Sequence, residues 1–215
     1  MKDGKNIVKA NNNQNALAFF GKITASMTHE IKNVLAIIQE SSGLMEDILT
    51  MSDNTDLKNK ERFIATLDRI QAQIQRGINI TSNLNRFAHS PDNVQERIDI
   101  NDLIQQLSIL VSRFAHLKKV ELITELDNSP FIIQANSVQL QMLIFNAIEI
   151  VLKHIENGTL KLISIHANEQ LKLHICYDLM TDDQFNCISA CEEWSLIQKR
   201  LLEIGIQLLI GSDQT

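Results

Sequence analysis

The 215-residue sequence is poor in the residues that build tight turns and covalent cross-links, with two prolines, seven glycines and three cysteines. An odd number of cysteines confined to the last fifth of the chain argues against a disulfide framework and indicates reduced thiols. Cys187 and Cys191 would share a helical face, but no pair of histidines accompanies them, so we expect no metal site.

The sequence also lacks long apolar runs and an excess of positive charge. No stretch approaches the roughly 18 consecutive apolar residues of a membrane span, and residues 1–15 carry no apolar signal-peptide core. The formal net charge of −6 opposes an electrostatically driven contact with nucleic acid. We therefore expect a cytoplasmic protein that has neither nucleic acid nor membrane as a partner.

The first half of the chain shows the alternating spacing of three and four residues that is typical of coiled-coil-like helices. A first helix is predicted over residues 15–51 and a second follows a turn at residues 52–56, which is rich in residues that bond their own backbone. The first series is Leu17, Phe20, Thr24, Met27, Ile31, Val34, Ile38, Ser41, Met45 and Ile48, and the second is Phe63, Leu67, Ile70, Ile74, Gly77, Thr81, Leu84 and Ala88.

Two helices with matching apolar seams predict an antiparallel hairpin. Such a hairpin would leave apolar surface exposed along its length if it stood alone, and pairing two copies into a four-helix bundle would cover that surface. A homodimer is therefore the expected assembly.

A domain boundary is predicted at residues 89–93, because the residue before Pro91 disfavours helix. The organisation expected is a flexible N-terminus (1–14), a helical hairpin (15–90) and an α/β domain (94–215), which is an α+β fold of helices on a mixed sheet. Strands are expected at 97–100, 120–126, 131–134, 160–166, 171–177 and 206–210, and helices at 101–116 (capped by Asn101), 137–155 (terminated by Gly158) and 183–203.

His29 falls at the heptad position farthest from the seam if Met27 and Ile31 point inward. An exposed imidazole on a rigid helix can act as a nucleophile or a proton carrier. Glu30 could accept its Nδ1 proton, and Asn33, on the same flank, could position a water or a phosphoryl oxygen. The alternative is an ordinary solvated helix surface.

The stretch Ser-Met-Thr-His-Glu-Ile-Lys-Asn-Val-Leu-Ala at residues 26–36 resembles the H-box of two-component sensor histidine kinases. The order of a hairpin followed by an α/β domain is similar to that family's dimerisation and histidine phosphotransfer hairpin with its GHKL-type ATPase domain. The resemblance implies that His29 is the phosphoacceptor, that Glu30 is its acid–base partner and that Asn33 orients water. Val34 replaces the family's usual proline.

The same resemblance identifies Asn146 with the magnesium-linked asparagine of the family's N-box and Asp178 with its adenine-contacting aspartate. Other parts of that ATP site are missing, because Met142 stands at the other polar position of the N-box and no glycine occurs between Gly158 and Gly205. Phosphates need the close backbone approach that glycine permits. The ATPase-like domain is therefore predicted to be degenerate, and Asn146 and Asp178 to be vestigial.

An intact hairpin with a degenerate ATPase-like domain is closest in architecture to the dimeric histidine phosphotransferases of phosphorelays. The function expected from this resemblance is phosphate transfer on His29 between the aspartates of response-regulator receiver domains, to which receiver phosphatase activity could be added. No cofactor is expected in that case. Two alternatives stay open: a divergent histidine kinase that phosphorylates His29 from ATP and Mg²⁺, and a scaffold or kinase regulator without chemistry. The sequence does not name the receivers or the direction of phosphate flow.

Overall fold

The computed structural model describes the backbone of residues 2–51, 57–90, 95–167 and 170–212. The predicted turn at residues 52–56 and most of the predicted boundary around Pro91 lie outside the described residues. Contacts divide the chain into two units, one formed by residues 24–87 and the other by residues 1–23 together with 88–215.

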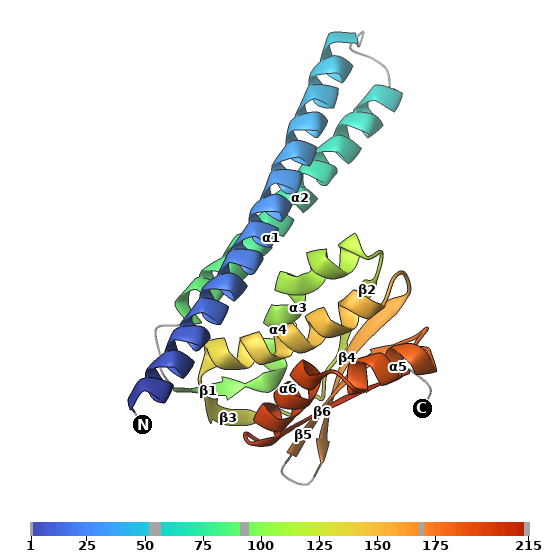
Figure 1. Cartoon of the computed structure of the whole chain (residues 1–215). Coiled ribbons are helices and arrows are strands. Elements are labelled where there is room, and N and C mark those ends of the chain that lie inside the picture. The colour runs from blue at the N-terminus through green and yellow to red at the C-terminus, as the bar shows by residue number, and fades with distance from the viewer. Residues whose placement is uncertain (1, 52–56, 91–94, 168–169, 213–215) are drawn as a thin grey trace. The chain divides into compact units, whose positions relative to one another are not determined.

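The unit of residues 24–87 is a pair of long helices, α1 (Lys2–Met51) and α2 (Leu57–His89), so the predicted helical hairpin is confirmed (Figure 1). The helix α1 begins well before the predicted start at Asn15 and contributes residues to both units. The predicted seam holds from Met27 onward, where every member is buried or half-buried: Met27, Ile31, Val34, Ile38, Ser41, Met45 and Ile48.

Before Met27 the predicted seam of α1 is wrong at Leu17 and Thr24. Leu17 is 72% exposed and Thr24 is also exposed, whereas Phe19 and Ile23 are buried. The reason is a different packing partner, because the Phe19 ring lies 5.1 Å from the ring of Phe145 in the α/β unit.

The inner face of α2 also differs from the predicted seam. At every second member of the predicted series, the residue directly before it points inward instead. Four of the eight predicted positions are half-buried, but Thr81 and Ala88 are exposed, and Leu67 and Ile74 are 44% and 49% exposed. A series with the same alternation of three and four residues points inward instead: Phe63, Thr66, Ile70, Gln73, Gly77, Ile80, Leu84 and Phe87. The inner face of α2 therefore includes the polar residues Thr66 and Gln73, while Leu67 and Ile74 lie on its outside.

The second unit is a layer of helices on a mixed four-stranded sheet with strand order β2-β4-β5-β6. The β2/β4 and β5/β6 pairs are parallel and the β4/β5 pair is antiparallel, while β1 and β3 form a separate antiparallel pair. The strands are β1 (Glu96–Asp99), β2 (Glu121–Glu125), β3 (Ile132–Ala135), β4 (Thr159–Ala167), β5 (Gln170–Tyr177) and β6 (Ile206–Gly211). The helices are α3 (Ile100–Leu117), α4 (Ser137–His154), α5 (Asp182–Ser189) and α6 (Glu192–Leu202).

Alternation along the strands places one side of the sheet in the core, as period-two patterning requires. Leu160 and Leu162 of β4 and Leu171, Leu173 and Ile175 of β5 are fully buried. The helices α3, α4 and α6 cover this side (Figure 1). The expected α+β fold, a helical hairpin followed by an α/β domain, is thus confirmed.

The helix predicted over residues 183–203 is interrupted between α5 and α6. Ile188 and Trp194, both fully buried, would point about 120° apart on one continuous helix at 100° per residue. The break at Ala190 and Cys191 allows both side chains to turn into the core.

The N-cap of α3 lies two residues before the predicted cap, Asn101. The N-cap is Asp99, whose carboxylate accepts a hydrogen bond from the backbone N–H of Asn101. The Asn101 side chain instead donates to the backbone carbonyls of Asp127 and Ser129 and so braces the loop between β2 and β3. In that loop, hydrogen bonds from the hydroxyl and backbone of Ser129 are the main cause that lowers the pKa of Asp127 to about 2.

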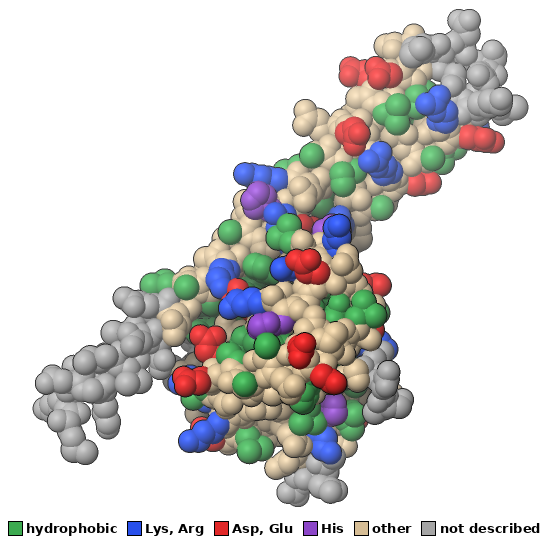
Figure 2. All heavy atoms as spheres, turned by 45° about the vertical axis from the view of Figure 1, so that its right-hand side comes forward, with side chains coloured by type: hydrophobic (Ala, Val, Ile, Leu, Met, Phe, Trp, Pro, Cys, Tyr) green, Lys and Arg blue, Asp and Glu red, His purple; other side chains and the backbone are tan. Residues whose placement is uncertain are grey.

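The described helices include none with the length and apolar character needed to cross a bilayer. Acidic and basic side chains alternate over the face of the molecule shown in Figure 2, where the described residues form no continuous basic surface.

Candidate functional site

His29 lies on α1 and is exposed, while Met27 and Val34 on the opposite side of the helix are buried. The imidazole is therefore accessible to a partner, as its heptad position predicts. Asn33, four residues later, and Lys32 are exposed on the same stretch of helix. The structure thus brings the three predicted residues His29, Glu30 and Asn33 together on one segment of α1.

Glu30 points toward the second helix of the hairpin. Its carboxylate accepts a hydrogen bond from the Arg76 guanidinium of α2 at 2.6 Å, and the Glu30 side chain is only 14% exposed. The ion pair joins the two helices beside His29, and low exposure reduces the solvent screening that weakens most surface ion pairs. Its effect is to fix the Glu30 carboxylate in place.

The close approach of the two helices at this level depends on Gly77. A Cβ atom at Gly77 would lie 3.3 Å from Cγ1 of Val34, a tighter contact than most side chains make. The absence of a side chain at Gly77 therefore leaves room for α1 next to the Glu30–Arg76 pair. The sequence pattern gives no signal for Arg76, although this residue directly precedes Gly77, a member of the predicted seam of α2.

Asn146 and Asp178, the two residues predicted from the resemblance to an ATP site, lie in the α/β unit. Asn146 is exposed on α4, and Met142, one turn earlier, is half-buried. Asp178 follows β5 and holds the beginning of β4, because its Oδ1 accepts the backbone N–H of Thr159 at 2.9 Å and its own N–H donates to the Thr159 carbonyl. Its carboxylate therefore has a structural hydrogen bond at this point.

The backbone of Gly158 lies close to the side chain of Asp178. Its φ of +75° lies in the left-handed region that favours glycine, and a Cβ atom there would lie 2.5 Å from Asp178 Oδ1. The predicted role of Gly158 as the terminator of α4 is thereby corrected, because α4 ends at His154 with Ile155 as its C-cap. Gly158 instead belongs to the turn that leads into β4.

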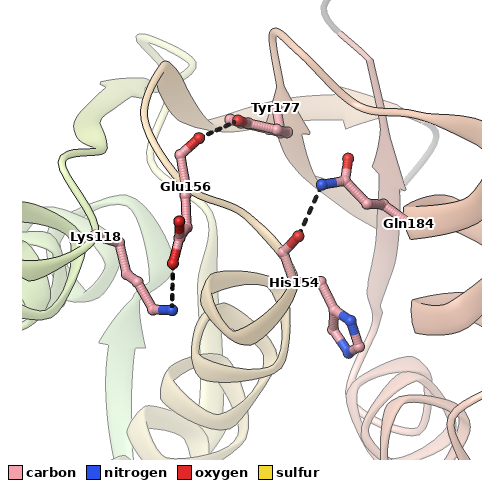
Figure 3. A network of polar contacts seen from close by, with 5 residues as sticks. All are labelled: Lys118, His154, Glu156, Tyr177 and Gln184. Atoms are coloured by element: carbon pink, nitrogen blue, oxygen red, sulfur yellow. Dashed lines mark hydrogen bonds and ion pairs between the residues drawn. The ribbon is translucent and has the colours of Figure 1, made fainter.

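The segment after Asp178 is held against the end of α4 by polar contacts (Figure 3). Gln184 of α5 donates to the His154 carbonyl at 2.7 Å and forms a capping box with Thr181. On the other side of the same loop, the Tyr177 hydroxyl donates to the carbonyl of Glu156, whose carboxylate pairs with Lys118. These contacts hold the segment around Asp178 against the C-terminal end of α4.

Apolar packing fills the space between α4 and the helices that follow β5. Trp194 and Leu201 of α6 and Ile188 of α5 are fully buried, and both helices contact α4. Trp194 therefore serves as a helix anchor, while Glu192 and Glu193 are exposed in the first turn of α6.

An apolar cavity of about 340 Å³ lies elsewhere in this unit, between α3 and α4. Its lining includes Phe114, Phe145 and Leu152 and contains neither Asn146 nor Asp178. The site that the sequence predicts for a nucleotide does not coincide with this cavity.

No protein-family model and no curated protein sequence matches the chain. Solved structures with a similar arrangement include the catalytic domain of histidine kinase ThkA, which is 14% identical and has a TM-score of 0.42, with 51% of this chain and 80% of that one covered. Histidine kinase AdeS from Acinetobacter baumannii is 13% identical with a TM-score of 0.39, covering 81% of this chain and 86% of its own. A complex of ThkA with the response regulator protein TrrA gives 16% identity and a TM-score of 0.40, covering 87% and 56%. All three TM-scores are below 0.5, so these likenesses are too weak to assign an activity.

Replacement of Gly158 by alanine should destabilise the α/β unit by more than replacement of Gly205. Both glycines have positive φ, which costs a residue with a Cβ about 1–2 kcal/mol, but only the Gly158 change also drives a Cβ into the Asp178 carboxylate. Gly211, which has open space around it, gives a control without either effect. Chemical denaturation would measure the three variants, and equal losses for Gly158→Ala and Gly205→Ala would contradict the structural role given to Asp178.

Proposed function

We propose that this chain is a two-component phosphotransfer protein that carries phosphate on His29 between the aspartates of receiver domains. The observation that carries the proposal is the exposed His29 imidazole on the hairpin, next to a Glu30 carboxylate that Arg76 holds in place. The H-box resemblance supplies the reaction class, and the receiver domains are the partners that this class requires.

In the proposed reaction, the Nε2 lone pair of His29 attacks the phosphorus of an aspartyl phosphate on the receiver. The P–N bond forms as the P–O bond to the carboxyl group breaks, and the aspartate leaves as a carboxylate. Such transfer depends on in-line positioning and electrostatic stabilisation more than on covalent help from the protein. Glu30 accepts a hydrogen bond from the Nδ1–H and stabilises the positive charge that develops on the ring. The reverse reaction delivers the phosphoryl group to a second receiver, and Asn33 orients water where the phosphoryl group is hydrolysed.

Three features of the α/β unit support a supply of phosphate from a receiver instead of from ATP. Asp178 Oδ1 is hydrogen-bonded to the backbone of β4, and α5 and α6 pack on α4 where a mobile lid would be needed. The chain also has no glycine between Gly158 and Gly205 to form a phosphate cradle. In this proposal the second unit is a degenerate ATPase-like domain that helps to hold the receiver and needs neither ATP nor Mg²⁺.

The source of the phosphate can be tested with two labelled donors. Incubation with a labelled phospho-receiver should place label on the chain, labelled ATP should not, and His29→Gln should abolish the transfer while leaving the fold intact. Label from ATP on His29 would identify the chain as a divergent kinase instead. No label from either donor, over a set of receivers, would favour a scaffold, and transfer to His29→Gln would show that the site is wrong.

Arg76→Gln should slow the transfer several-fold, because the Glu30 carboxylate would lose the contact that holds it in place. The matched control is Arg69→Gln on the same helix, where Arg69 pairs at 3.3 Å with the exposed Glu40, away from His29. Exposed pairs of this kind contribute about 0.2–1 kcal/mol, so the control should change neither stability nor rate appreciably. Transfer rates measured at several pH values would check this, with partial rescue expected for Arg76→Lys. Equal rates for the two glutamine variants would exclude a positioning role for Arg76.

We also propose that two hairpins associate into a homodimeric four-helix bundle. Ile64, Leu67, Ile74 and Ile78 are each between 44% and 51% exposed and recur on one face of α2 at helical spacing. A contiguous apolar stripe of this kind on a soluble protein marks an interface, and a symmetric dimer buries the stripe against its own copy.

The dimer predicts that Ile74→Lys will convert the protein to a monomer in analytical ultracentrifugation, since a charge would be desolvated at the centre of the interface. Leu196→Lys is the control, because Leu196 is equally exposed (51%) but lies on α6 in the other unit. If wild type and Ile74→Lys sediment alike, the stripe is not the dimer interface.

A further inference from the structure

A polar cavity of about 210 Å³ lies where β1, the first turns of α3 and the first turn of α4 meet. Its lining differs in character from that of the apolar cavity between α3 and α4, and includes Glu96, Asp99 and Asp102 with a single basic residue, Arg97. Three carboxylates against one guanidinium give the lining a formal charge of −2. Neither His29 nor the predicted nucleotide residues Asn146 and Asp178 belong to its lining.

Gln141 lines this cavity, and its buried amide has one polar atom unsatisfied. The side chain is 8% exposed, and its Nε2 donates to the hydroxyl of Ser137, itself 6% exposed, at 3.2 Å. Its Oε1 has no hydrogen-bond partner among the described residues. A buried acceptor without a donor is destabilising, so a residue of this kind calls for a ligand that supplies the donor.

Asn146 and Gln141 lie on different sides of α4. They are five residues apart, which places them about 140° from each other around the helix. The cavity is therefore separate from the surface on which the predicted nucleotide residue lies.

We propose that this cavity binds an alkyl guanidinium group. A group that satisfies Gln141 Oε1 must donate a hydrogen bond, and the acidic lining favours a donor that is positively charged. Asp99 already accepts the backbone N–H groups of Asn101 and Phe131, so the carboxylate of the exposed Asp102 is the one that we assign to the ligand's charge.

Geometry and size favour guanidinium over other cations. Its planar fork presents five N–H donors in fixed directions, which suits an amide and carboxylates contributed by two helices and a strand. The volume is below the roughly 300–1,000 Å³ of sites for drug-sized ligands but holds several waters, so it suits a side-chain-sized group. The described residues contain no cluster of three or more metal-ligating side chains, which argues against a metal ion as the cation.

The guanidinium group can come from a free metabolite or from an arginine of a partner protein. Agmatine and the blocked tripeptide acetyl-Gly-Arg-Gly-amide are the two probes that separate these sources, and isothermal titration calorimetry on the full chain is the measurement. Saturable binding of agmatine would assign the site to a free ligand. Binding of the tripeptide alone would assign it to an arginine in a protein.

Two variants and a matched control decide whether the binding occurs in this cavity. Gln141→Met keeps the shape of the side chain but removes the oxygen, and should weaken binding at least tenfold. Gln139→Met makes the same change at an exposed position two residues away on α4 and should have no effect. Asp102→Asn, an exposed change that does not disturb the core, should weaken binding several-fold and serves if Gln141→Met does not fold.

The proposal is overturned if neither probe binds saturably, since water alone would then occupy the cavity. It is also overturned if Gln141→Met and Gln139→Met bind alike, or if 1,4-diaminobutane, which has an ammonium in place of the guanidinium, binds as tightly as agmatine. The His29→Gln variant should bind the probes as the wild type does. The outcome therefore does not depend on whether His29 carries phosphate.

Discussion

The alignment of α2 against α1 is the constraint on which the candidate site depends. The pairs Glu30–Arg76, Val34–Gly77 and Glu40–Arg69 all belong to one antiparallel register. A slip by one helical turn would separate Glu30 from Arg76 and bring a side chain, instead of Gly77, against α1. The exposed His29 would keep its place on α1, but the carboxylate beside it would lose its partner.

The same register has an energetic cost that indicates how the hairpin is completed. It turns Thr66 and Gln73 inward, and the buried Oε1 of Gln73 and Oγ of Ser41 have no hydrogen-bond partner among the described residues. Unsatisfied polar atoms are destabilising, while Leu67 and Ile74 gain nothing from their exposed positions. Burial of the apolar stripe against a second hairpin would offset that cost, which is the physical reason for expecting a dimer.

The hairpin could be predicted from the sequence because its three-and-four spacing runs through both helices, but the inner face of α2 could not. The predicted seam of α2 and its observed inner face share four residues: Phe63, Ile70, Gly77 and Leu84. The members between them differ by one position in the sequence, and both series have helical spacing. A bundle helix buries a broad stripe, so hydrophobicity alone favoured the more apolar series, which contains Leu67 and Ile74. The choice is made by tertiary packing, and Arg76 was missed because its partner became visible only with the register.

In the α/β unit the strands and most helices could be predicted, since their patterns are strong, whereas the details that decide function could not. The alternating residues of β4 and β5 predicted the sheet, but the break between α5 and α6 carries no proline or glycine signal and results from burying both Ile188 and Trp194. Asp178 matches the adenine-contacting aspartate in the resemblance, yet its Oδ1 accepts a hydrogen bond from the backbone of β4 and lies close to Gly158.

That arrangement bears on the proposal that the second unit does not supply phosphate from ATP. A loop that cradles phosphate must present free backbone N–H groups on flexible, glycine-rich chain. In this chain the segment after Asp178 is capped by Thr181, bonded to α4 through Gln184 and anchored by the buried Trp194. A phosphohistidine needs none of that cradle, because an aspartyl phosphate already holds the free energy that ATP would supply. If His29 receives its phosphate from a receiver, the second unit needs only to stay folded and to present a surface.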